Sequence, residues 1–425
     1  MCYFSNGVTR VLRGMPFRAA ACTGALYHID LYLVCGELPG LAAGVYHYGP
    51  QDDALRLLRP GEFRGTLIEA CGGQEWVARA PVSIVYTTTY WRNAWKYQER
   101  AYRHAFWDSG TILANTLALA AAHGLPSGVV MGFVDRSVNR LLDLDAQKEV
   151  ALLVAPLGHT PDQMLPPAPP IAPLNLRTAR YSFAEVEYPA IRAMHAASSL
   201  SSANEVRTWR QARPAAPVDG SARTAAMTPL RPLALDVVSD SIEAVIRSRG
   251  STRRFERTPI SCDALSTILA SATRRFEADY RTEPGTPLAE CFLLVNAVEG
   301  LEPGAYRYRP GGDKLELLDA GERRDVAGHL ALDQELGADA AVNVYFLAHL
   351  PSILEALGNR GYRAAQLDAS VMAGKMYLAA YALGLGATGL TFYDDEVTHF
   401  FGRPAADRSP MFLLALGNPA LQREC

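Results

Sequence analysis

The strongest constraint on the fold is an internal repeat, because segments far apart in the chain match at a constant offset. Residues 41–58 (LAAGVYHYGPQDDALRLL) and residues 301–318 (LEPGAYRYRPGGDKLELL) are identical at about half of their positions. The offset of 260 residues recurs where residues 99–125 match residues 359–385, and GFVDRSVNRLL matches TFYDDEVTHFF after a one-residue slip. Chance alone can produce one such match, but three in the same order indicate a repeat. The sequence therefore predicts two homologous halves.

Each half contains the same order of expected elements. Short apolar strands and an alternating hairpin (VYHYGP or AYRYRP) precede one long helix rich in Ala, Leu and Met. The alternation has the period of half-buried strands. Both long helices are expected to end at a Gly-Leu pair, Gly124–Leu125 and Gly384–Leu385. Mixed strands with helices on their faces form an α+β layer, so we predict an α+β fold for each half.

The halves are separated by a segment of different composition. Residues 160–175 are proline-rich and cannot form a regular helix or ladder. Residues 183–195 are amphipathic and favour a helix, whereas the Ser-, Ala- and Arg-rich residues 196–219 predict a surface excursion. We divide the chain into a first domain (1–159), a connecting segment (160–235) and a second domain (236–425).

Composition excludes several classes of protein. With 49% hydrophobic residues, 20% charged residues and a net charge of -3, the chain can bury a core and does not resemble a nucleic-acid or anionic-membrane binder. No apolar run reaches the roughly 18 to 20 residues that span a bilayer. The first residues lack a secretory signal, and the seven cysteines are scattered without metal-ligand spacing. We expect a cytoplasmic protein with free thiols, without a metal site and without a membrane or nucleic-acid partner.

Residues 384–389 (GLGATG) match the GxGxxG fingerprint of dinucleotide-binding loops, but their context is wrong. The fingerprint works after a strand and before a helix, where backbone amides meet pyrophosphate. Here it follows a helix and precedes an extended segment. A helix C-cap with a turn is the simpler interpretation, and backbone amides directed at a different ligand are the alternative.

The stretch RSRGSTRRF (residues 247–255) is the most informative motif. Arg249, Ser251 and Arg253 can place two guanidinium groups and a hydroxyl around one phosphate, and Gly250 lets the backbone approach the anion. In isolation such a run is more often a solvated basic turn.

RGSTRRF resembles the opening motif of the nitroreductase family, whose members hold the phosphate of FMN with these residues. Residues 384–402 resemble the SagB-type branch, which oxidises thiazolines and oxazolines to azoles. Residues 18–34 and 95–110 are similar to two further segments of that branch, and the second segment contains a proposed catalytic Lys-Tyr pair. The resemblance covers nearly all of both halves but not the connecting segment. It implies two nitroreductase-like mixed-sheet domains that form an intramolecular pseudo-dimer.

Family members bind FMN in the dimer interface, and here the two halves have lost complementary parts. A first-half copy of the phosphate motif would fall before residue 1, through genuine loss of an N-terminal helix or a misplaced start, and Lys96–Tyr97 has no second-half copy. We therefore predict one FMN per chain. The expected site residues are Arg249, Gly250, Ser251, Arg253, Gly389, Leu390 and Thr391 from the second half and Arg18, Cys22, Thr23 and Gly24 from the first, with Lys96 and Tyr97 as the catalytic pair.

The resemblance implies an FMN-dependent dehydrogenase acting on an azoline-like heterocycle in a peptide or a carrier-bound intermediate, with biosynthetic partner proteins. An NAD(P)H-dependent nitro- or quinone reductase and a non-catalytic scaffold are the alternatives. Cys22 is interpreted as a packed thiol rather than a redox group. The three aromatic residues Tyr90, Trp91 and Trp95 form either core or a substrate pocket. Arg100, Tyr102 and Arg103 recur in both halves, so we assign them to scaffold or interface.

Overall fold

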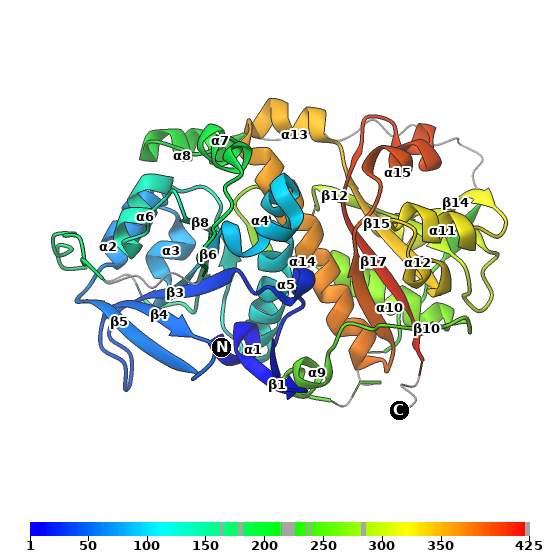
Figure 1. Cartoon of the computed structure of the whole chain (residues 1–425), viewed down its shortest axis with the longest axis horizontal. Helices are drawn as coiled ribbons and strands as arrows, with labels where there is room; N and C mark the ends of the chain where they lie inside the picture. Colours follow the sequence, from blue (N-terminus) through cyan, green and yellow to red (C-terminus); the bar gives the residue numbers. More distant parts are fainter. Residues whose placement is uncertain are drawn as a thin grey trace.

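The computed structural model describes residues 1–161, 165–176, 182–212, 214, 226–234, 237–238, 240–281 and 286–420. The two halves lie side by side, the first in blue to cyan and the second in light green to red (Figure 1). Part of the second half's expected counterpart of the Cys22 loop, residues 282–285, and Cys425 lie outside the described residues.

In the first half, helices pack on both faces of a five-stranded sheet. All neighbouring strands are antiparallel, in the order β5-β4-β3-β6-β8. Its elements are α1 (Cys2–Asn6), β1 (Val8–Leu12), β2 (Met15–Arg18), η1 (Thr23–Ala25), β3 (Ile29–Cys35), β4 (Gly44–Gly49), β5 (Ala54–Pro60), α2 (Arg64–Ala70), α3 (Glu75–Arg79), β6 (Val82–Thr89), α4 (Trp91–Tyr97), η2 (Gln98–Arg100), α5 (Ala101–Ala122), β7 (Gly128–Val129), α6 (Asp135–Leu142) and β8 (Glu149–Leu157).

The second half repeats this plan with additional edge strands. Its sheet has the order β10-β17-β15-β12-β13-β14-β9, with β16 paired to β17. Its elements are α9 (Ile242–Ser248), β10 (Phe255–Glu256), α10 (Cys262–Thr273), β11 (Glu277–Ala278), β12 (Ala289–Val295), β13 (Gly304–Arg309), η3 (Pro310–Gly312), β14 (Lys314–Ala320), α11 (Arg324–Leu330), α12 (Glu335–Asp339), β15 (Val342–Ala348), α13 (Leu350–Leu357), α14 (Arg360–Ala382), β16 (Gly386–Leu390), α15 (Asp394–Phe401), η4 (Arg403–Ala405) and β17 (Ser409–Pro419).

The two sheets are middle layers, and this corrects one expectation. The alternating hairpins were expected to be half-buried, but β4 and β13 are almost fully buried. In β4, Tyr46 and Tyr48 belong to the core that contains α5, whereas Val45 belongs to the smaller core that contains α2 and α6. Apolar layers on both faces therefore bury both sets of alternating residues.

The long helices α5 and α14 cross at the centre of the molecule (Figure 1). A methyl group added at Gly110 would lie 2.5 Å from the Cβ of Ser370, and one added at Gly374 would lie 2.6 Å from the Cβ of Ala114. Each residue therefore contacts its own repeat counterpart, which happens only next to a two-fold axis. The predicted pseudo-dimer is confirmed, and its axis passes through this crossing.

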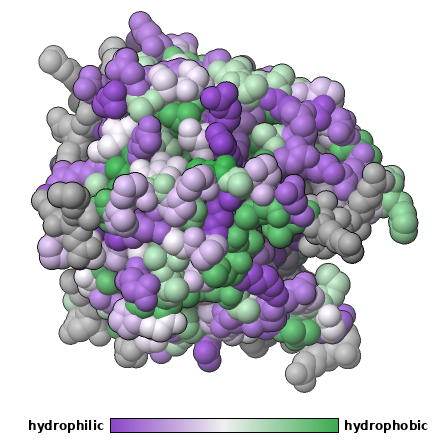
Figure 2. All heavy atoms as spheres, turned by 90° about the vertical axis from the view of Figure 1, so that its left-hand side faces the viewer, coloured by the Kyte–Doolittle hydropathy of each residue, from purple (hydrophilic) through white to green (hydrophobic). Residues whose placement is uncertain are grey.

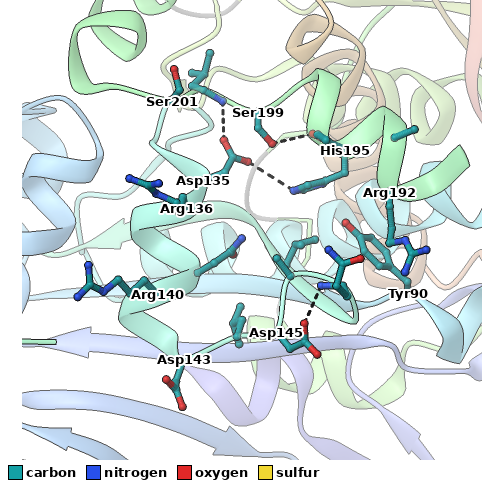
Figure 3. A pocket seen from close by; sticks show the side chains of 18 residues that line it. Tyr90, Asp135, Arg136, Arg140, Asp143, Asp145, Arg192, His195, Ser199 and Ser201 are labelled. Atoms are coloured by element: carbon teal, nitrogen blue, oxygen red, sulfur yellow. Dashed lines mark hydrogen bonds and ion pairs between the residues drawn. The ribbon is translucent and has the colours of Figure 1, made fainter. Parts of the chain in front are cut away.

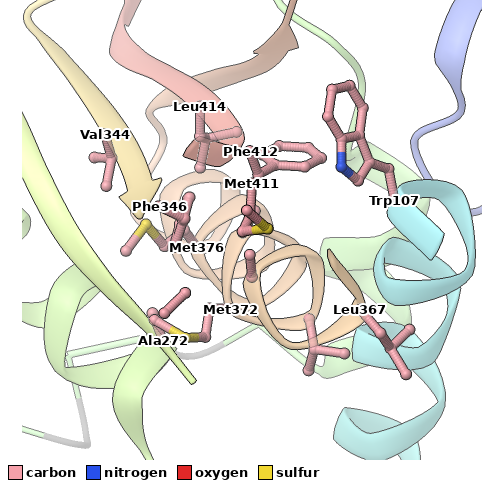
Figure 4. Close-up of a cluster of buried hydrophobic side chains, with 14 of the residues drawn as sticks. Trp107, Ala272, Val344, Phe346, Leu367, Met372, Met376, Met411, Phe412 and Leu414 are labelled. Atoms are coloured by element: carbon pink, nitrogen blue, oxygen red, sulfur yellow. The ribbon is translucent and has the colours of Figure 1, made fainter. Parts of the chain in front are cut away.

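The core of the second half lies between α14 and the sheet (Figure 4). Met372 and Met376 on α14 are buried with Phe346 of β15. Trp107 of α5 reaches across from the first half to Phe412 of β17, with ring centroids 5.2 Å apart. The two halves thus share one continuous core.

The connecting segment is more structured than its composition suggested. Residues 196–219 were expected to be a surface excursion, but Val206 and Trp209 within them are buried on a helix. The amphipathic stretch does form a helix, although it begins only at Pro189. A strand inside the segment pairs with β14, so the predicted boundary at residue 235 falls after an element of the second sheet. The elements of the segment are α7 (Pro189–Ala197), α8 (Ala203–Gln211) and β9 (Met227–Pro229).

The outer face of the first half carries hydrophilic residues with a narrow band of hydrophobic ones among them (Figure 2). Leu55 and Leu57 of β5 contribute exposed apolar side chains to the surface of this half. Within the described residues, no helix has both the length and the apolar character needed to cross a bilayer.

Candidate active site

Two adjoining cavities lie between the halves and contain nearly all the predicted site residues. The first has a volume of about 260 Å³ and the second about 800 Å³. All eleven predicted cofactor residues and Tyr97 line one or both cavities. Lys96 is the one predicted site residue that lines neither of them. The residues shared by the two cavities are Ala21, Cys22, Ala25, Ser251 and Arg253.

The larger cavity is strongly cationic. No carboxylate is among the described residues that line it, whereas six arginines are. Burial lowers the pKa of Arg249, and the nearby Arg10 lowers it further. A cluster of guanidinium groups of this kind favours an anion, and phosphate fits their geometry. The six arginines are Arg10, Arg13, Arg18, Arg249, Arg253 and Arg254.

Arg249 also ties the two halves together. It is 5% exposed, and its Nε donates to the carbonyl oxygen of Ala19 at 3.0 Å. Arg18 in turn donates from Nη1 to the carbonyl oxygen of Ile29 at 2.9 Å. Arg253 is exposed, so its guanidinium remains available to a ligand. The two arginines of the motif therefore have different tasks, one in the interface and one facing the cavity.

The loop at Cys22–Gly24 is held by one buried carboxylate. Asp108 accepts hydrogen bonds from the Thr23 amide (2.9 Å) and hydroxyl (2.8 Å) and from the Cys22 thiol (3.0 Å), and it contacts His28 Nε2 at 2.9 Å. Burial opposes ionisation, but the hydrogen bond with His28 keeps the pKa of Asp108 below its ordinary value. Burial and Asp108 raise the pKa of Cys22 well above its ordinary value. Cys22 is thus a protonated hydrogen-bond donor, which agrees with its interpretation as a packed thiol.

Tyr97 lies over this loop. Gly24 has φ +64°, and a methyl group there would come within 2.7 Å of the Tyr97 hydroxyl oxygen. Lys96 and Tyr97 are the last two residues of α4. Lys96 is exposed, with its Nζ 5.3 Å from the centre of the Tyr97 ring. Trp95, also on α4, is 52% exposed, so the aromatic run belongs only in part to the core.

The GATG segment forms a strand rather than the turn suggested by its glycines. Gly384 does end the preceding helix with φ +72°, but Gly386–Leu390 pairs antiparallel with β17 as β16. The Gly389 amide donates to the hydroxyl of Tyr377, which lines the same cavity. Pairing with β17 outweighs the weak strand preference of glycine. The missing side chain of glycine lets the backbone approach the cavity closely.

The pseudo-two-fold counterpart of the cavity is filled by the chain itself. Asp279 accepts hydrogen bonds from the amides of Met131 (2.9 Å) and Gly132 (2.8 Å), the counterparts of Leu390 and Thr391. Burial raises the pKa of Asp279. The Trp209 ring lies against Gly132, where an added methyl group would be 3.0 Å from it.

Two further internal contacts are made at the same blocked position. The Trp209 indole donates at 2.9 Å to the carbonyl oxygen of Leu357, the counterpart of Tyr97. Arg281 forms a buried ion pair at 2.6 Å with Asp368, the counterpart of Asp108. The blocked position therefore holds internal side chains in place of a ligand.

Several cavity residues were not found from the sequence. Trp107, Tyr377 and Phe412 line the smaller cavity, and their repeat counterparts are leucines. A comparison of the two halves position by position would have marked them as specific to one site. Arg10 and Arg13 lie on or next to β1, which has no resemblance to a motif, so no sequence signal identified them.

A larger cleft of about 1270 Å³ lies elsewhere, between α6 and α7 (Figure 3). It contains none of the predicted site residues. Its wall includes Tyr90 and the buried His195, whose pKa burial lowers well below its ordinary value. His195 lies 3.7 Å from Asp135.

Comparison with known proteins identifies one family. The nitroreductase family matches residues 17–159 and 246–418. A nitroreductase-like protein, MJ1384 of Methanocaldococcus jannaschii, is 27% identical over 143 residues, 34% of this chain and 71% of that protein. McbC of Escherichia coli, a microcin B17-processing protein, is 28% identical over 144 residues, 33% of this chain and 53% of McbC.

One solved structure shares the tandem arrangement. A nitroreductase-like protein of Anabaena variabilis is 25% identical to this chain, with a TM-score of 0.80. The match covers 98% of this chain and 86% of the other, so it includes the connecting segment as well as both halves.

Proposed function

Because this chain belongs to the nitroreductase family, we propose that it is an oxidoreductase that holds one FMN between its halves and oxidises an azoline-like heterocycle in a peptide or carrier-bound intermediate. The observation that carries this proposal is the composite cavity. Among the described residues, one end offers six arginines and no carboxylate, which suits a phosphate, and the other offers Trp107, Phe412 and the edge of β16, which suit a flat ring system.

The blocked counterpart supports the ring end of this assignment. There the carboxylate of Asp279 occupies two backbone amides. By pseudo-symmetry, the amides of Leu390 and Thr391 offer the same pair of donors to an electronegative edge of the flavin ring. Such donors stabilise negative charge that develops on a bound ring. The absence of these internal substitutes from the other site fits one FMN per chain.

The processing role named for McbC supports the substrate class. An azoline becomes aromatic when the ring loses a hydride and a proton. Bound FMN would supply the hydride acceptor. Tyr97, whose hydroxyl lies over the Cys22–Gly24 loop at the cavity wall, is placed to take the ring proton. Lys96 lies beside it, with its Nζ 5.3 Å from the centre of the Tyr97 ring, and its catalytic role remains a prediction.

An anaerobic mixing experiment tests the proposal. FMN-loaded protein is mixed with a synthetic thiazoline peptide, and bleaching of the flavin absorbance is followed together with thiazole formation. We expect bleaching by the peptide, and a loss of about 10²- to 10⁴-fold in its rate for Tyr97→Phe with flavin retained. Lys314→Ala, which changes an exposed lysine far along the chain, is the control for Lys96→Ala.

Three results would contradict the proposal in different ways. Bleaching by NADPH but not by the thiazoline peptide would indicate a nitro- or quinone reductase. Protein that retains no flavin at any concentration tested would indicate a scaffold. An unchanged rate for both Tyr97→Phe and Lys96→Ala would remove the pair from the catalytic role.

A further inference from the structure

Two clusters of ion pairs between the halves are related by the pseudo-two-fold axis. Arg360 and Arg363 donate to Asp135, the first residue of α6. Arg100 and Arg103 donate to Asp394, the first residue of α15. The side chain of Asp135 is 6% exposed and that of Asp394 is 26% exposed. The aspartate is therefore covered at the start of α6 and more exposed at the start of α15.

The cover over Asp135 is the short link between α7 and α8. The Leu200 amide donates to Asp135 Oδ2 at 2.9 Å, and the Leu200 carbonyl oxygen accepts from the Asp135 amide at 3.2 Å. Leu200 also forms a parallel bridge with Val134. Arg363 donates to the Ser198 hydroxyl at 2.7 Å. The contact is made by backbone groups, so it does not depend on the identity of the bound side chain.

This bound segment leads into the blocked cavity. Nine residues after Leu200, Trp209 places its planar ring against Gly132, the counterpart of the cavity residue Thr391. The indole is hydrogen-bonded at Leu357, the counterpart of Tyr97. The chain thus shows, at the blocked position, a segment bound at an aspartate with a flat ring beside it.

Next to the cavities, the corresponding aspartate, Asp394, has no counterpart of the Leu200 contact among the described residues. In the described residues, the Asp394 carboxylate is bonded by Arg100 and Arg103, and nothing accepts from the Asp394 amide. Asp394 follows Thr391 of the cavity wall by three residues, a distance of at most about 11 Å. That span matches about three residues of an extended peptide.

We propose that Asp394 docks an extended segment of the peptide substrate, about three residues N-terminal to the heterocycle. The N–H of one substrate residue donates to the Asp394 carboxylate, and the C=O of the same residue accepts from the Asp394 amide, as Leu200 does at Asp135. This inference rests on the proposed function for its choice of substrate.

Binding of a product-like peptide tests the docking without requiring turnover. The FMN-loaded full chain is titrated with a fluorescein-labelled heptapeptide carrying a thiazole, and the dissociation constant is measured by anisotropy. N-methylation of each amide N-terminal to the thiazole is scanned in turn. We expect one position, about three residues from the ring, where N-methylation weakens binding by about 10- to 100-fold, the effect of losing a hydrogen bond to a charged group.

A chemical double-mutant cycle assigns that effect to Asp394. In Asp394→Ala the sensitive N-methylation should have no further effect, whereas Asp395→Ala, an exposed neighbour, should preserve it. Flavin content and melting temperature show whether each variant is folded, and the scan on the unchanged protein needs no variant. Uniform tolerance of N-methylation, retention of the sensitive position in folded Asp394→Ala, or no binding of the peptide would overturn the docking. Peptide that docks as expected while its thiazoline form is never oxidised would overturn the proposed function alone.

Discussion

At the scale of single residues, Asp108 and Asp368 are counterparts that perform the same structural task with different consequences. Asp108 fixes the Cys22–Gly24 loop of the cavity, and Asp368 binds Arg281 and the Leu288 amide in the blocked half. Both carboxylates are buried. Their exchange for asparagine replaces an acceptor oxygen with a donor that faces existing donors.

We expect Asp108→Asn and Asp368→Asn each to lower the free energy of unfolding by about 1–3 kcal/mol. Asp108→Asn should also weaken FMN binding by at least about tenfold, because the loop lines the cavity, while Asp368→Asn should leave FMN affinity unchanged. Urea unfolding and flavin titration of the two variants measure both effects. Equal FMN affinity in the two variants would show that the loop does not contact the flavin.

Glu149 predicts a pH-dependent stability. Burial, with a contribution from Asp30, raises the pKa of Glu149 to about 7. Its folded-state pKa is above the unfolded value, so folding favours the protonated form. The stability present below about pH 4.5 is lost as pH rises through about 7.

Glu149→Gln keeps an acceptor oxygen for Thr87 and Tyr32 and removes this charge. We expect the variant to be more stable than the unchanged protein by about 1–3 kcal/mol at pH 8 and equally stable at pH 4.5. Denaturant unfolding at the two pH values is the measurement. A gain that is the same at both pH values would mean that ionisation of Glu149 is not its cause.

At the scale of elements, the contact between α5 and α14 depends on small residues at the pseudo-two-fold axis. A methyl group at Gly110 would approach Ser370 to 2.5 Å and also meet its backbone. Gly65, on α2, has open space around its missing side chain. The two glycines therefore form a matched pair for alanine substitution.

We expect Gly110→Ala to destabilise the protein by about 1–3 kcal/mol, because a well-packed contact must separate. Gly65→Ala should be neutral or stabilising by about 0.5–1 kcal/mol through helix preference alone. Thermal and denaturant unfolding distinguish the two. A neutral Gly110→Ala would show that the helices separate freely, contrary to one shared core.

Sequence patterns predicted the regular elements well where a single feature dominated. The repeat predicted both long helices and the main strands of each sheet, because apolar periodicity and a glycine C-cap act over short distances. The strand at Gly386–Leu390 was missed because its pairing with β17 is a tertiary effect. The burial of Trp209 was missed for the same reason, since a Ser- and Arg-rich composition says nothing about the cavity that one tryptophan fills.

The candidate site was accessible from sequence because motif residues come from a few short stretches. Arg249–Arg253, Cys22–Gly24 and Gly389–Thr391 all reach the two cavities as expected. Lys96 does not, because α4 ends at Tyr97 and leaves its neighbour facing outward. The additional arginines of the larger cavity, Arg10 and Arg13, could be identified only after folding had brought β1 beside Gly250.

At the scale of the whole molecule, the two pseudo-symmetric interface positions differ: one holds the two adjoining cavities, and the other is filled by side chains of the chain itself. The halves share a core, exchange ion pairs across one axis and divide the cavity residues between them. Asp279, Trp209 and Arg281 fill the second position with a carboxylate, a planar ring and a cation. Among the described residues, the chain therefore has the interface of a dimer, with one of its two pseudo-symmetric positions filled from within.

The number of FMN molecules per chain tests this account most directly. Flavin-free full-length protein, with its concentration from amino-acid analysis, is titrated with FMN while the quenching of flavin fluorescence is followed. The account predicts an end point at one FMN per chain, and loss of most of the affinity in Arg253→Ala. An end point at two per chain would contradict it, because the second FMN would have to displace Asp279 and Trp209 from the blocked position.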